Sequence, residues 1–392
     1  MDLTHTPGTE ALRAAAREWL RAHVPAVPLP SLETAEGFAA HREWEAALHA
    51  DRWSVVSWPE EYGGRGADIF GWLVFEEEYH AAGAPGRVSQ NGINLLAPTL
   101  FDHGTEEQRA RVLPSMASGE VIWAQAWSEP EAGSDLASLT SKAVRTEGGW
   151  LLYGQKTWSS RAAFADRAFG IFRTDPEAAR PHHGLTYLMF DLRAPGVTVR
   201  PIGRLDGKPA FAELFLDGVF VPDGDVIGEP GQGWRIAMST TGNERGLTLR
   251  SPGRFLAAAD RLAALWGAGR EGARPRGGGE APDGGGGLRD RVADALAGAR
   301  AYELFTWANA SRFAAGESIG AESSLNKVFW SEYDIALHET ALDLLGPDGE
   351  LADGEWAEPW VFSLAGPIYA GTNEIQRDII AERLLGLPKG RR

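Results

Sequence analysis

The chain has 392 residues, of which 43% are hydrophobic and 23% charged, so it can bury a large core divided between two or three subdomains. The formal net charge of −16 excludes a broad nucleic-acid or anionic-membrane surface, although a local basic pocket for a phosphate-bearing ligand remains compatible with it. Cysteine is absent, which excludes disulfides, thiolate metal sites and a cysteine nucleophile. The polar start of the chain and the lack of a long apolar run predict a cytoplasmic protein without a signal peptide or a membrane span.

The first third of the chain has the periodicity of helices. Apolar residues fall on one helical face between residues 10 and 23, and three prolines then break the pattern. Two further apolar-faced segments surround Trp44 and Trp72, with a glycine-containing loop over residues 58–64 between them. We therefore expect a helical domain over residues 1–121.

From about residue 121, short runs that alternate between apolar and polar residues replace the helical stripes. Glycine, proline and aspartate stand between these runs as turn formers. The runs that predict strands are residues 150–154, 168–172, 184–192, 197–202 and 212–220. A small β domain over residues 122–230 is the expected result.

Helical periodicity returns over residues 231–392, where we expect a second helical domain. Pro252 suits the first turn of a helix whose apolar side includes Phe255. Residues 267–287 are rich in glycine and lack a large apolar side chain, which predicts a flexible surface loop.

A last helix is expected to begin near Thr372 and to end at Gly386. Its spacing predicts that Ile375, Ile379 and Leu384 are buried. The order of helices, then strands, then helices indicates an α+β fold with a β insert between two helical blocks.

Two polar segments of the β block carry groups that a ring-shaped cofactor needs. Residues 123–135 include hydroxyls at Ser128 and Ser134 and a glycine, Gly133, that allows close backbone approach. Residues 154–160 combine a glycine, a tryptophan and two serines. Hydroxyl and amide donors suit the edge of such a ring, and an aromatic wall suits its face. Either segment alone is most simply a polar turn, but together they favour a cofactor site.

Four motifs in this order resemble the acyl-CoA dehydrogenase family, and the similarity begins with Trp-Pro-Glu-Glu-Tyr-Gly-Gly at residues 58–64. The motifs are Ser-Glu-Pro-Glu-Ala-Gly-Ser-Asp at 128–135, Gly-Gln-Lys-Thr-Trp at 154–158, Ile-Gly-Glu-Pro-Gly-Gln-Gly-Trp at 227–234 leading to Asn-Glu-Arg-Gly at 243–246, and Ile-Tyr-Ala-Gly-Thr-Asn-Glu-Ile-Gln-Arg at 368–377. The resemblance implies a helical N-terminal domain, a middle β barrel and a C-terminal four-helix bundle. It also implies an FAD-dependent oxidoreductase of lipid metabolism, which removes hydrogens from the α and β carbons of an acyl-CoA thioester.

The resemblance further implies which positions bind the cofactor and the substrate. The positions implied to bind FAD are Gln125, Trp127, Ser128, Gly133, Ser134, Trp158, Ser160, Thr372 and Glu374. Those implied to bind the substrate are Ser134, Arg245, Ala370 and Gly371. For Arg245, a surface ion pair with Glu244 is the simpler alternative.

The residue that removes the α proton departs from the commonest family pattern. Many members have a glutamate at the position of Ala370, which cannot accept a proton. A second family arrangement puts the base one residue before an arginine, as in Glu244-Arg245 here, so Glu244 is the expected base. The backbone N–H of Ala370 keeps its implied role as a donor to the thioester oxygen. Otherwise Glu244 is a helix-surface carboxylate and the chain is inactive.

The resemblance implies an electron-transfer flavoprotein as the electron acceptor, and it bears on assembly. Homotetrameric members carry an Arg-x-x-Phe-Gly segment that grips a neighbour's FAD, and residues 288–297 lack its Phe-Gly. A Gln-x-x-Gly-Gly run is missing from residues 342–349. These gaps predict an oligomer in which a homologous partner subunit supplies half of the FAD site, as in dehydrogenases of steroid catabolism. A homo-oligomer that uses other contacts is the alternative.

Other functions are compatible with the same residues. A flavin oxidase, a nitroalkane oxidase or a flavin monooxygenase would share the fold, a non-catalytic subunit would share the motifs, and a carrier-protein thioester could replace CoA. His182 and His183 are expected to be solvated turn residues and no metal site is predicted. The turn at residues 231–233 lacks the lysine of a phosphate-binding loop.

Overall fold

The structure is a computed structural model that describes residues 5–245, 251–272, 287–317, 320–351 and 354–390; for residues 242–245 and 269–272 it describes the backbone only. The chain divides by its packing into two compact units. The helical unit is Met1–Val24, Asp68–Ala84 and Arg245–Arg392, and the sheet unit is Pro25–Ala67 and Pro85–Glu244. The order of helices, then a sheet, then helices is confirmed, whereas the expected domain bounds, residues 1–121, 122–230 and 231–392, stay a prediction.

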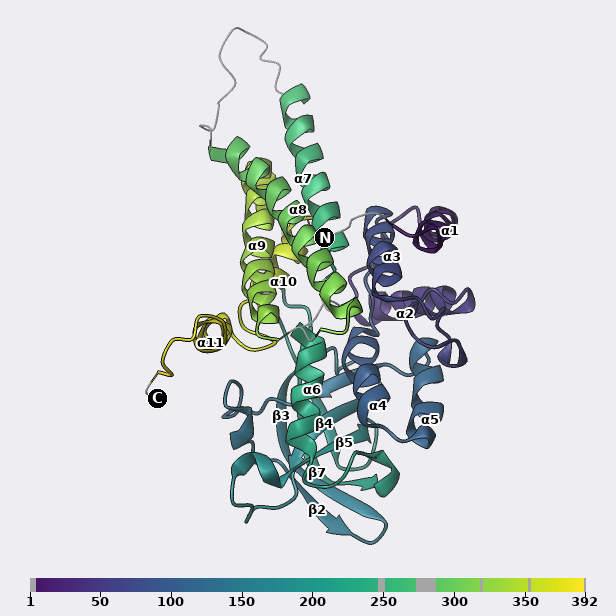
Figure 1. Ribbon diagram of the computed structural model, residues 1–392, viewed down its shortest axis with the longest axis vertical. Coiled ribbons are helices and arrows are strands. Elements are labelled where there is room, and N and C mark those ends of the chain that lie inside the picture. The colour runs from purple at the N-terminus through teal and green to yellow at the C-terminus, as the bar shows by residue number, and fades with distance from the viewer. Residues whose placement is uncertain (1–4, 246–250, 273–286, 318–319, 352–353, 391–392) are drawn as a thin grey trace. The chain divides into compact units, whose positions relative to one another are not determined.

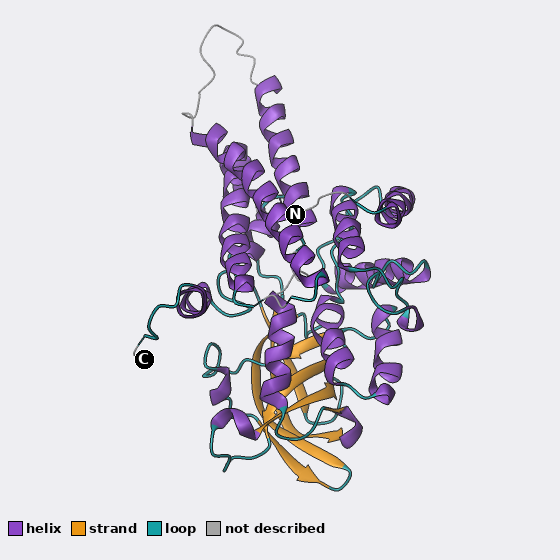
Figure 2. Cartoon of the chain, viewed as in Figure 1, coloured by secondary structure: helices purple, strands orange, loops and turns teal. Residues whose placement is uncertain are grey.

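The sheet unit contains one eight-stranded sheet, drawn in orange in Figure 2. Its strands are β1 Trp123–Ala126, β2 Lys142–Thr146, β3 Gly149–Ser160, β4 Arg167–Arg173, β5 Leu185–Asp191, β6 Val197–Ile202, β7 Phe211–Pro222 and β8 Val226–Ile227. The strand order is β6-β7-β3-β2-β4-β5-β8, and β1 pairs in parallel with β4. All five predicted strands are confirmed, whereas β1, β2 and β8 are too short for an alternation to stand out in the sequence.

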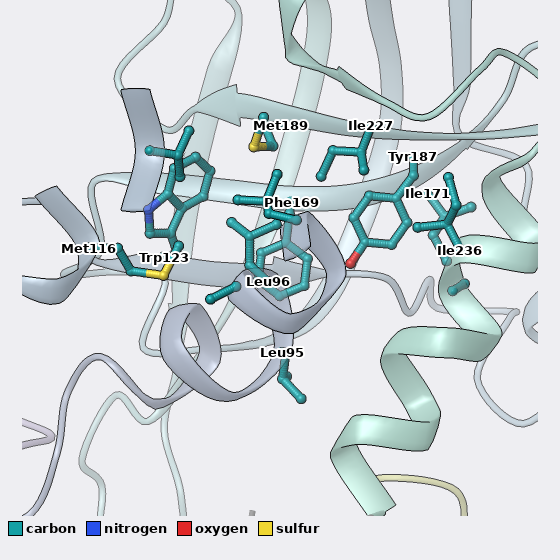
Figure 3. Packing of buried hydrophobic residues seen from close by; sticks show 14 of the residues in the cluster. Leu95, Leu96, Met116, Trp123, Phe169, Ile171, Tyr187, Met189, Ile227 and Ile236 are labelled. Carbon is teal, nitrogen blue, oxygen red and sulfur yellow. The ribbon is translucent and has the colours of Figure 1, made fainter. Parts of the chain in front are cut away.

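Strands β4 and β5 are buried on both faces. Successive side chains of a strand point to opposite sides of the sheet, so each of these strands contributes to a hydrophobic cluster on either side. Phe169 on β4 and Tyr187 on β5 face one hydrophobic cluster, and Phe172 and Phe190 face a second. The first cluster, shown in Figure 3, joins these strands to side chains of the unit's helices, including Ile236. The helices of the sheet unit are α2 Ala35–Ala50, α4 Ala97–His103, α5 Glu106–Ala117 and α6 Gly233–Arg245.

The helical unit is built from long helices of the C-terminal region together with α1 and α3 (Figure 1). Its helices are α1 Pro7–His23, α3 Ile69–Ala81, α7 Pro252–Gly272, α8 Gly287–Ala314, α9 Glu322–Leu345, α10 Ala357–Ser363 and α11 Asn373–Ile379. Phe255 on α7, Tyr302 on α8 and Trp330 on α9 meet in its core. Arg13 and Arg17 of α1 bind Glu78 of α3, which fixes that pair of helices.

Two expectations for this unit are wrong in part. Helix α7 continues to Gly272, so residues 267–272 are helical and not the start of a loop; residues 273–286 of that predicted loop lie outside the described residues. The last helix does begin at Thr372, but it does not bury Ile375, Ile379 and Leu384, and Leu384 is 37% exposed. This helix is instead anchored by the buried polar side chains of Asn373 and Gln376.

Within the described residues, no helix combines the length and the apolar character needed to cross a membrane.

Candidate active site

The first polar segment continues from β1 across the first hydrophobic cluster. Trp127 is buried with its ring edge-on to Tyr187, at 6.1 Å between centroids and 89° between planes. Gln125 and Ser128 on either side are half-buried. The Ser128 carbonyl accepts a hydrogen bond of 2.9 Å from the N–H of Thr157, which joins this segment to the second one.

The second polar segment forms the end of β3, where the pairing with β7 is irregular. The register shifts between Lys156 and Ser159, which is typical of a β-bulge. At the bulge Trp158 has φ 57°, a left-handed conformation that costs about 1–2 kcal/mol for a residue other than glycine. Its indole is 59% exposed and rests edge-on against Phe211 at 5.9 Å, while Ser160 is half-buried. The bulge therefore turns the aromatic face of Trp158 outward, whereas a regular strand would direct it elsewhere.

A fully buried lysine connects the two segments. The Lys156 ammonium donates to the Trp127 carbonyl at 3.2 Å, to the Ile171 carbonyl at 2.8 Å and to Glu129 Oε1 at 2.9 Å. Lys156 belongs to the second segment, whereas Trp127 and Glu129 belong to the first. One side chain thus holds both segments against β4, and its charge is balanced by a carboxylate from the first segment.

The pair remains ionised at neutral pH. Burial acts to raise the pKa of Glu129, but the charge of Lys156 and hydrogen bonds from Thr140 and Ser141 outweigh it, and the pKa falls to about 2. Burial lowers the pKa of Lys156 to about 8, against the opposing effect of the Glu129 charge. Both groups are therefore charged near pH 7, and the pair is a rigid element of the site rather than a proton carrier.

The side chains of these segments fit a flavin ring. In the described part of the chain, Trp127 Nε1 and Ser159 Oγ are buried without a hydrogen-bond partner. A Cβ added at Gly133 would meet nothing within 4 Å, so the backbone there is open to a ligand, and Ser134 beside it is exposed. Together with the outward face of Trp158, the sheet unit offers polar donors and an aromatic wall, the two features that an isoalloxazine ring requires.

The C-terminal motif lies in the helical unit and has a special backbone. Ala370 has φ 57° and Gly371 has φ 79°, so two successive residues are left-handed. Thr372 caps α11 by accepting a hydrogen bond of 3.3 Å from the N–H of Ile375. Glu374 is exposed in the first helical turn, where its carboxylate accepts hydrogen bonds from its own backbone N–H and from the Thr372 hydroxyl, which lower its pKa. Thr372 and Glu374 are thus available to a ligand at a helix start.

Buried polar side chains hold this turn in place. Gln376 donates from Nε2 to the Ala370 carbonyl at 3.0 Å and to the Gly371 carbonyl at 3.3 Å. Asn373 accepts a hydrogen bond of 2.8 Å from the fully buried Lys327 of α9. The turn is therefore tied to α11 through Gln376, and the start of α11 is tied to α9 through Asn373.

The expected base and its neighbour end helix α6. Glu244 and Arg245 are its last two residues, and their side chains lie outside those that the structure describes. One turn earlier, Thr240 is fully buried and bonds Thr99 of α4 at 2.7 Å. The Tyr187 hydroxyl lies 3.4 Å from the same Thr240 oxygen, so the helix that carries Glu244 is linked to the aromatic contact of Trp127.

The sequence predicts no role for Glu129, Lys156 or Gln376, although each lies inside a motif. A signal for Lys156 was present, because Trp150 and Leu152 precede it at even spacing on the buried face of β3. A charge at a buried strand position requires a partner, and Glu129 is the carboxylate of the first motif that the fold brings to it. Nothing comparable in the sequence marks Gln376, whose bonds depend on the conformation of the preceding turn.

The two adjacent histidines pack against each other. His182 and His183 lie in a short helical turn before β5 with their rings 4.4 Å apart. Across the residues that the structure describes, no group of three or more histidine, cysteine, aspartate or glutamate side chains could hold a metal ion.

The chain is similar to known proteins over nearly its whole length. The acyl-CoA dehydrogenase N-terminal domain matches residues 6–120, the middle domain residues 124–219 and the C-terminal domain residues 231–385. The chain is 36% identical over 402 residues to the acyl-CoA dehydrogenase IpdE1 of Mycolicibacterium smegmatis, covering 97% of this chain and 98% of that protein.

Solved structures with the same fold include two complexes. The steroid acyl-CoA dehydrogenase Tcur3481–Tcur3483 superimposes with a TM-score of 0.82 at 30% identity, over 100% of both chains. The ChsE4–ChsE5 complex from Mycobacterium tuberculosis gives a TM-score of 0.80 at 30% identity, again over 100% of both chains.

The fold and the two polar segments define a flavoprotein oxidoreductase. The chain belongs to the acyl-CoA dehydrogenase family, whose cofactor is FAD, and it is an enzyme that acts on a CH–CH bond of an acyl-CoA.

Proposed function

We propose that this chain oxidises an acyl-CoA thioester between its α and β carbons, with Glu244 as the base that removes the α proton. The substrate is a CoA ester of a steroid fragment, and the electrons pass on to an electron-transfer flavoprotein. The steroid assignment is supported by the name of a similar protein, a steroid acyl-CoA dehydrogenase. The electron acceptor is what the resemblance of the motifs to the family implies.

The base assignment rests on the residues at two positions, an alanine at 370 and a glutamate at 244. Ala370 has no group that can take a proton, yet its backbone keeps a left-handed turn. Within the described residues, the N–H groups of Ala370 and Gly371 have no acceptor. Glu244 follows the buried Thr240 by one helical turn, on the helix that is tied to Trp127 through Tyr187. Loss of the carboxylate at one position together with a glutamate at the other supports relocation of the base.

The proposed roles follow from the chemistry of an α proton, which is weakly acidic until the thioester carbonyl is polarised. Ala370 N–H donates to the carbonyl oxygen, and the Glu244 carboxylate takes the α proton as negative charge develops on that oxygen. When bound, FAD would supply the two-electron acceptor for the β hydrogen. Gln125, Trp127, Ser128, Gly133, Ser134, Trp158 and Ser160 hold the flavin end of the cofactor, and Thr372 and Glu374 hold its adenosine end. Arg245, Ser134 and Gly371 line the path of the thioester.

Glu244→Gln tests the base while preserving the size of the side chain. We expect the rate of flavin bleaching by a saturating acyl-CoA, followed without oxygen, to fall by about 10²–10⁴-fold, the usual contribution of a general base. FAD content and substrate binding should remain those of the unsubstituted enzyme. Unchanged bleaching would contradict the assignment of Glu244.

A relocation variant makes the test more specific. Ala370→Glu in the Glu244→Gln background returns a carboxylate to the commoner family position, and part of the lost bleaching rate should return. If Glu244→Gln is inactive only because it disturbs α6, the second substitution will recover nothing. Rapid reoxidation of the reduced enzyme by air, without an electron-transfer flavoprotein, would instead favour an oxidase or a monooxygenase.

We propose in addition that the chain works with a homologous partner subunit that completes the FAD site. The support is the missing Phe-Gly of residues 288–297, the missing Gln-x-x-Gly-Gly run of residues 342–349, and the complexes among its structural relatives. FAD content should be low when the chain is purified alone and should rise on co-expression with its partner. Full flavin occupancy in a homo-oligomer would contradict this assembly.

A further inference from the structure

The turn that precedes α11 combines an unfavourable backbone with unused donors. Ala370 is one of four residues other than glycine with positive φ in the described chain, and Gly371 continues the left-handed conformation. Neither N–H donates to an acceptor among the described residues. Backbone held in a sparsely populated region with its donors free is typical of ligand-binding turns, where surrounding contacts maintain the conformation.

One side chain contacts both left-handed residues of this turn. Gln376 is fully buried, and its Nε2 bridges the carbonyl oxygens of Ala370 and Gly371 at 3.0 and 3.3 Å. These are the carbonyls of the two left-handed residues themselves. The orientation of the carboxamide is fixed by chemistry, because a flipped amide would place its oxygen against two other oxygens.

The other end of the Gln376 carboxamide has no hydrogen-bond partner among the described residues. Gln376 Oε1 is buried and has no hydrogen-bond partner in the described part of the chain. A buried carbonyl without a partner is destabilising, whereas the two hydrogen bonds that Nε2 donates to the turn are favourable. The glutamine thus holds the turn at the expense of one unsatisfied oxygen, an exception of the kind that calls for an explanation such as a functional role.

We propose that Gln376 is a positioning residue for the reaction, which holds Ala370 in the left-handed conformation that aims its N–H at the thioester oxygen. This inference rests on the proposed function, in which that N–H polarises the substrate carbonyl. Gln376 does not touch the substrate; it acts through the carbonyls of Ala370 and Gly371. The side chain at position 370 has no part in it.

Gln376→Met in the flavin-loaded enzyme tests the inference, since methionine keeps the length of the side chain but cannot donate. The probe is 4-dimethylaminocinnamoyl-CoA, a conjugated thioester whose absorption moves to longer wavelength when its carbonyl oxygen accepts hydrogen bonds. The unsubstituted enzyme should produce this red shift and Gln376→Met should lose most of it. With a true substrate, kcat should fall by about 10- to 100-fold, as for a displaced reacting group, while FAD content stays unchanged.

A second background separates positioning from general damage. Glycine adopts the left-handed conformation without the Cβ penalty, so Ala370→Gly makes the turn less dependent on Gln376. In the Ala370→Gly background, Gln376→Met should lower kcat by less than about threefold, a mutual dependence that a double-mutant cycle measures. Equal losses in both backgrounds would overturn the inference.

Gln108→Met is the matched control. Gln108 is also a buried glutamine whose Nε2 donates to two carbonyls, those of Gly224 and Val226, at 3.0 and 2.6 Å. Its substitution should lower stability without changing the red shift of the probe. A red shift that Gln376→Met leaves intact overturns the positioning role, whereas its absence from the unsubstituted enzyme would count against the thioester site itself.

Discussion

Lys156→Met is the sharpest test of how the two polar segments of residues 123–135 and 154–160 are held together. The substitution removes three hydrogen bonds from Nζ and leaves the Glu129 carboxylate buried without its counter-charge. Removing one partner of a buried ion pair destabilises a protein by about 3–5 kcal/mol. Glu129 keeps the hydrogen bonds from Thr140 and Ser141, so we expect a loss near the lower end of that range, about 3 kcal/mol.

The assay is urea unfolding followed by tryptophan fluorescence, because Trp127 lies at the lysine contact. FAD must be held at one concentration, since a ligand that binds only the folded state adds to its apparent stability. Lys142→Met is the control: Lys142 is exposed on β2 and should cost no more than about 0.5 kcal/mol. FAD binding should weaken in Lys156→Met, because the carbonyl of Trp127 is no longer fixed.

Two results would refute this reasoning. One is a loss below about 1 kcal/mol for Lys156→Met, which would mean that the pair contributes no more than a surface ion pair does. The other concerns the double variant Lys156→Met, Glu129→Gln, which removes both charges together. It should be less destabilised than the sum of the two single variants, and simple additivity would show that the two groups do not interact.

The free energy of unfolding should also depend on pH between about 4.5 and 2. Because the pKa of Glu129 is about 2 in the folded protein against an ordinary value of 4.5, its contribution of about 3 kcal/mol is present above pH 4.5 and is lost as the pH falls toward 2. The difference in unfolding free energy between the unsubstituted protein and Glu129→Gln should shrink across that window, and a constant difference would contradict the assignment. Gly154→Ala should destabilise by more than about 2 kcal/mol. At φ 136° its Cβ would lie 2.3 Å from Ser141 Oγ and 2.7 Å from Ser141 Cα. Gly148→Ala is the matched control, because at φ 71° its Cβ meets nothing within 4 Å; equal losses in thermal unfolding would rule out the clash as the cause.

Part of the site could be read from residue types in order along the chain. The tryptophans, serines and glycines of residues 123–135 and 154–160 indicated a cofactor site before any coordinates, because polar donors beside aromatic rings suit a flavin. Short runs bounded by turn formers predicted β3, β4, β5, β6 and β7. Burial alternates with a period of two along β7, which has one buried face, whereas β4 and β5 are buried on both faces. The replacement of an acid by Ala370 was visible from the sequence as well.

Other features could not be predicted, because they depend on which segments meet. The period of two places Lys156 on a buried face, but only the pairing of the strands brings Glu129 and the carbonyls of Trp127 and Ile171 to its ammonium. The helical spacing of Ile375 predicted that α11 buries an apolar face. The fold instead buries the polar side chain of Gln376 on this helix. A local pattern does not say which side of a short helix faces its neighbours.

The sequence by itself determined the family, the α+β order of elements and the residue types of the two polar segments, because these depend on composition, periodicity and motif order. The tertiary structure alone decided the left-handed backbone of Trp158 and Ala370 and the side chains that hold it. The physical reason is that a strained conformation persists only where distant parts of the chain supply the hydrogen bonds and packing that offset its cost.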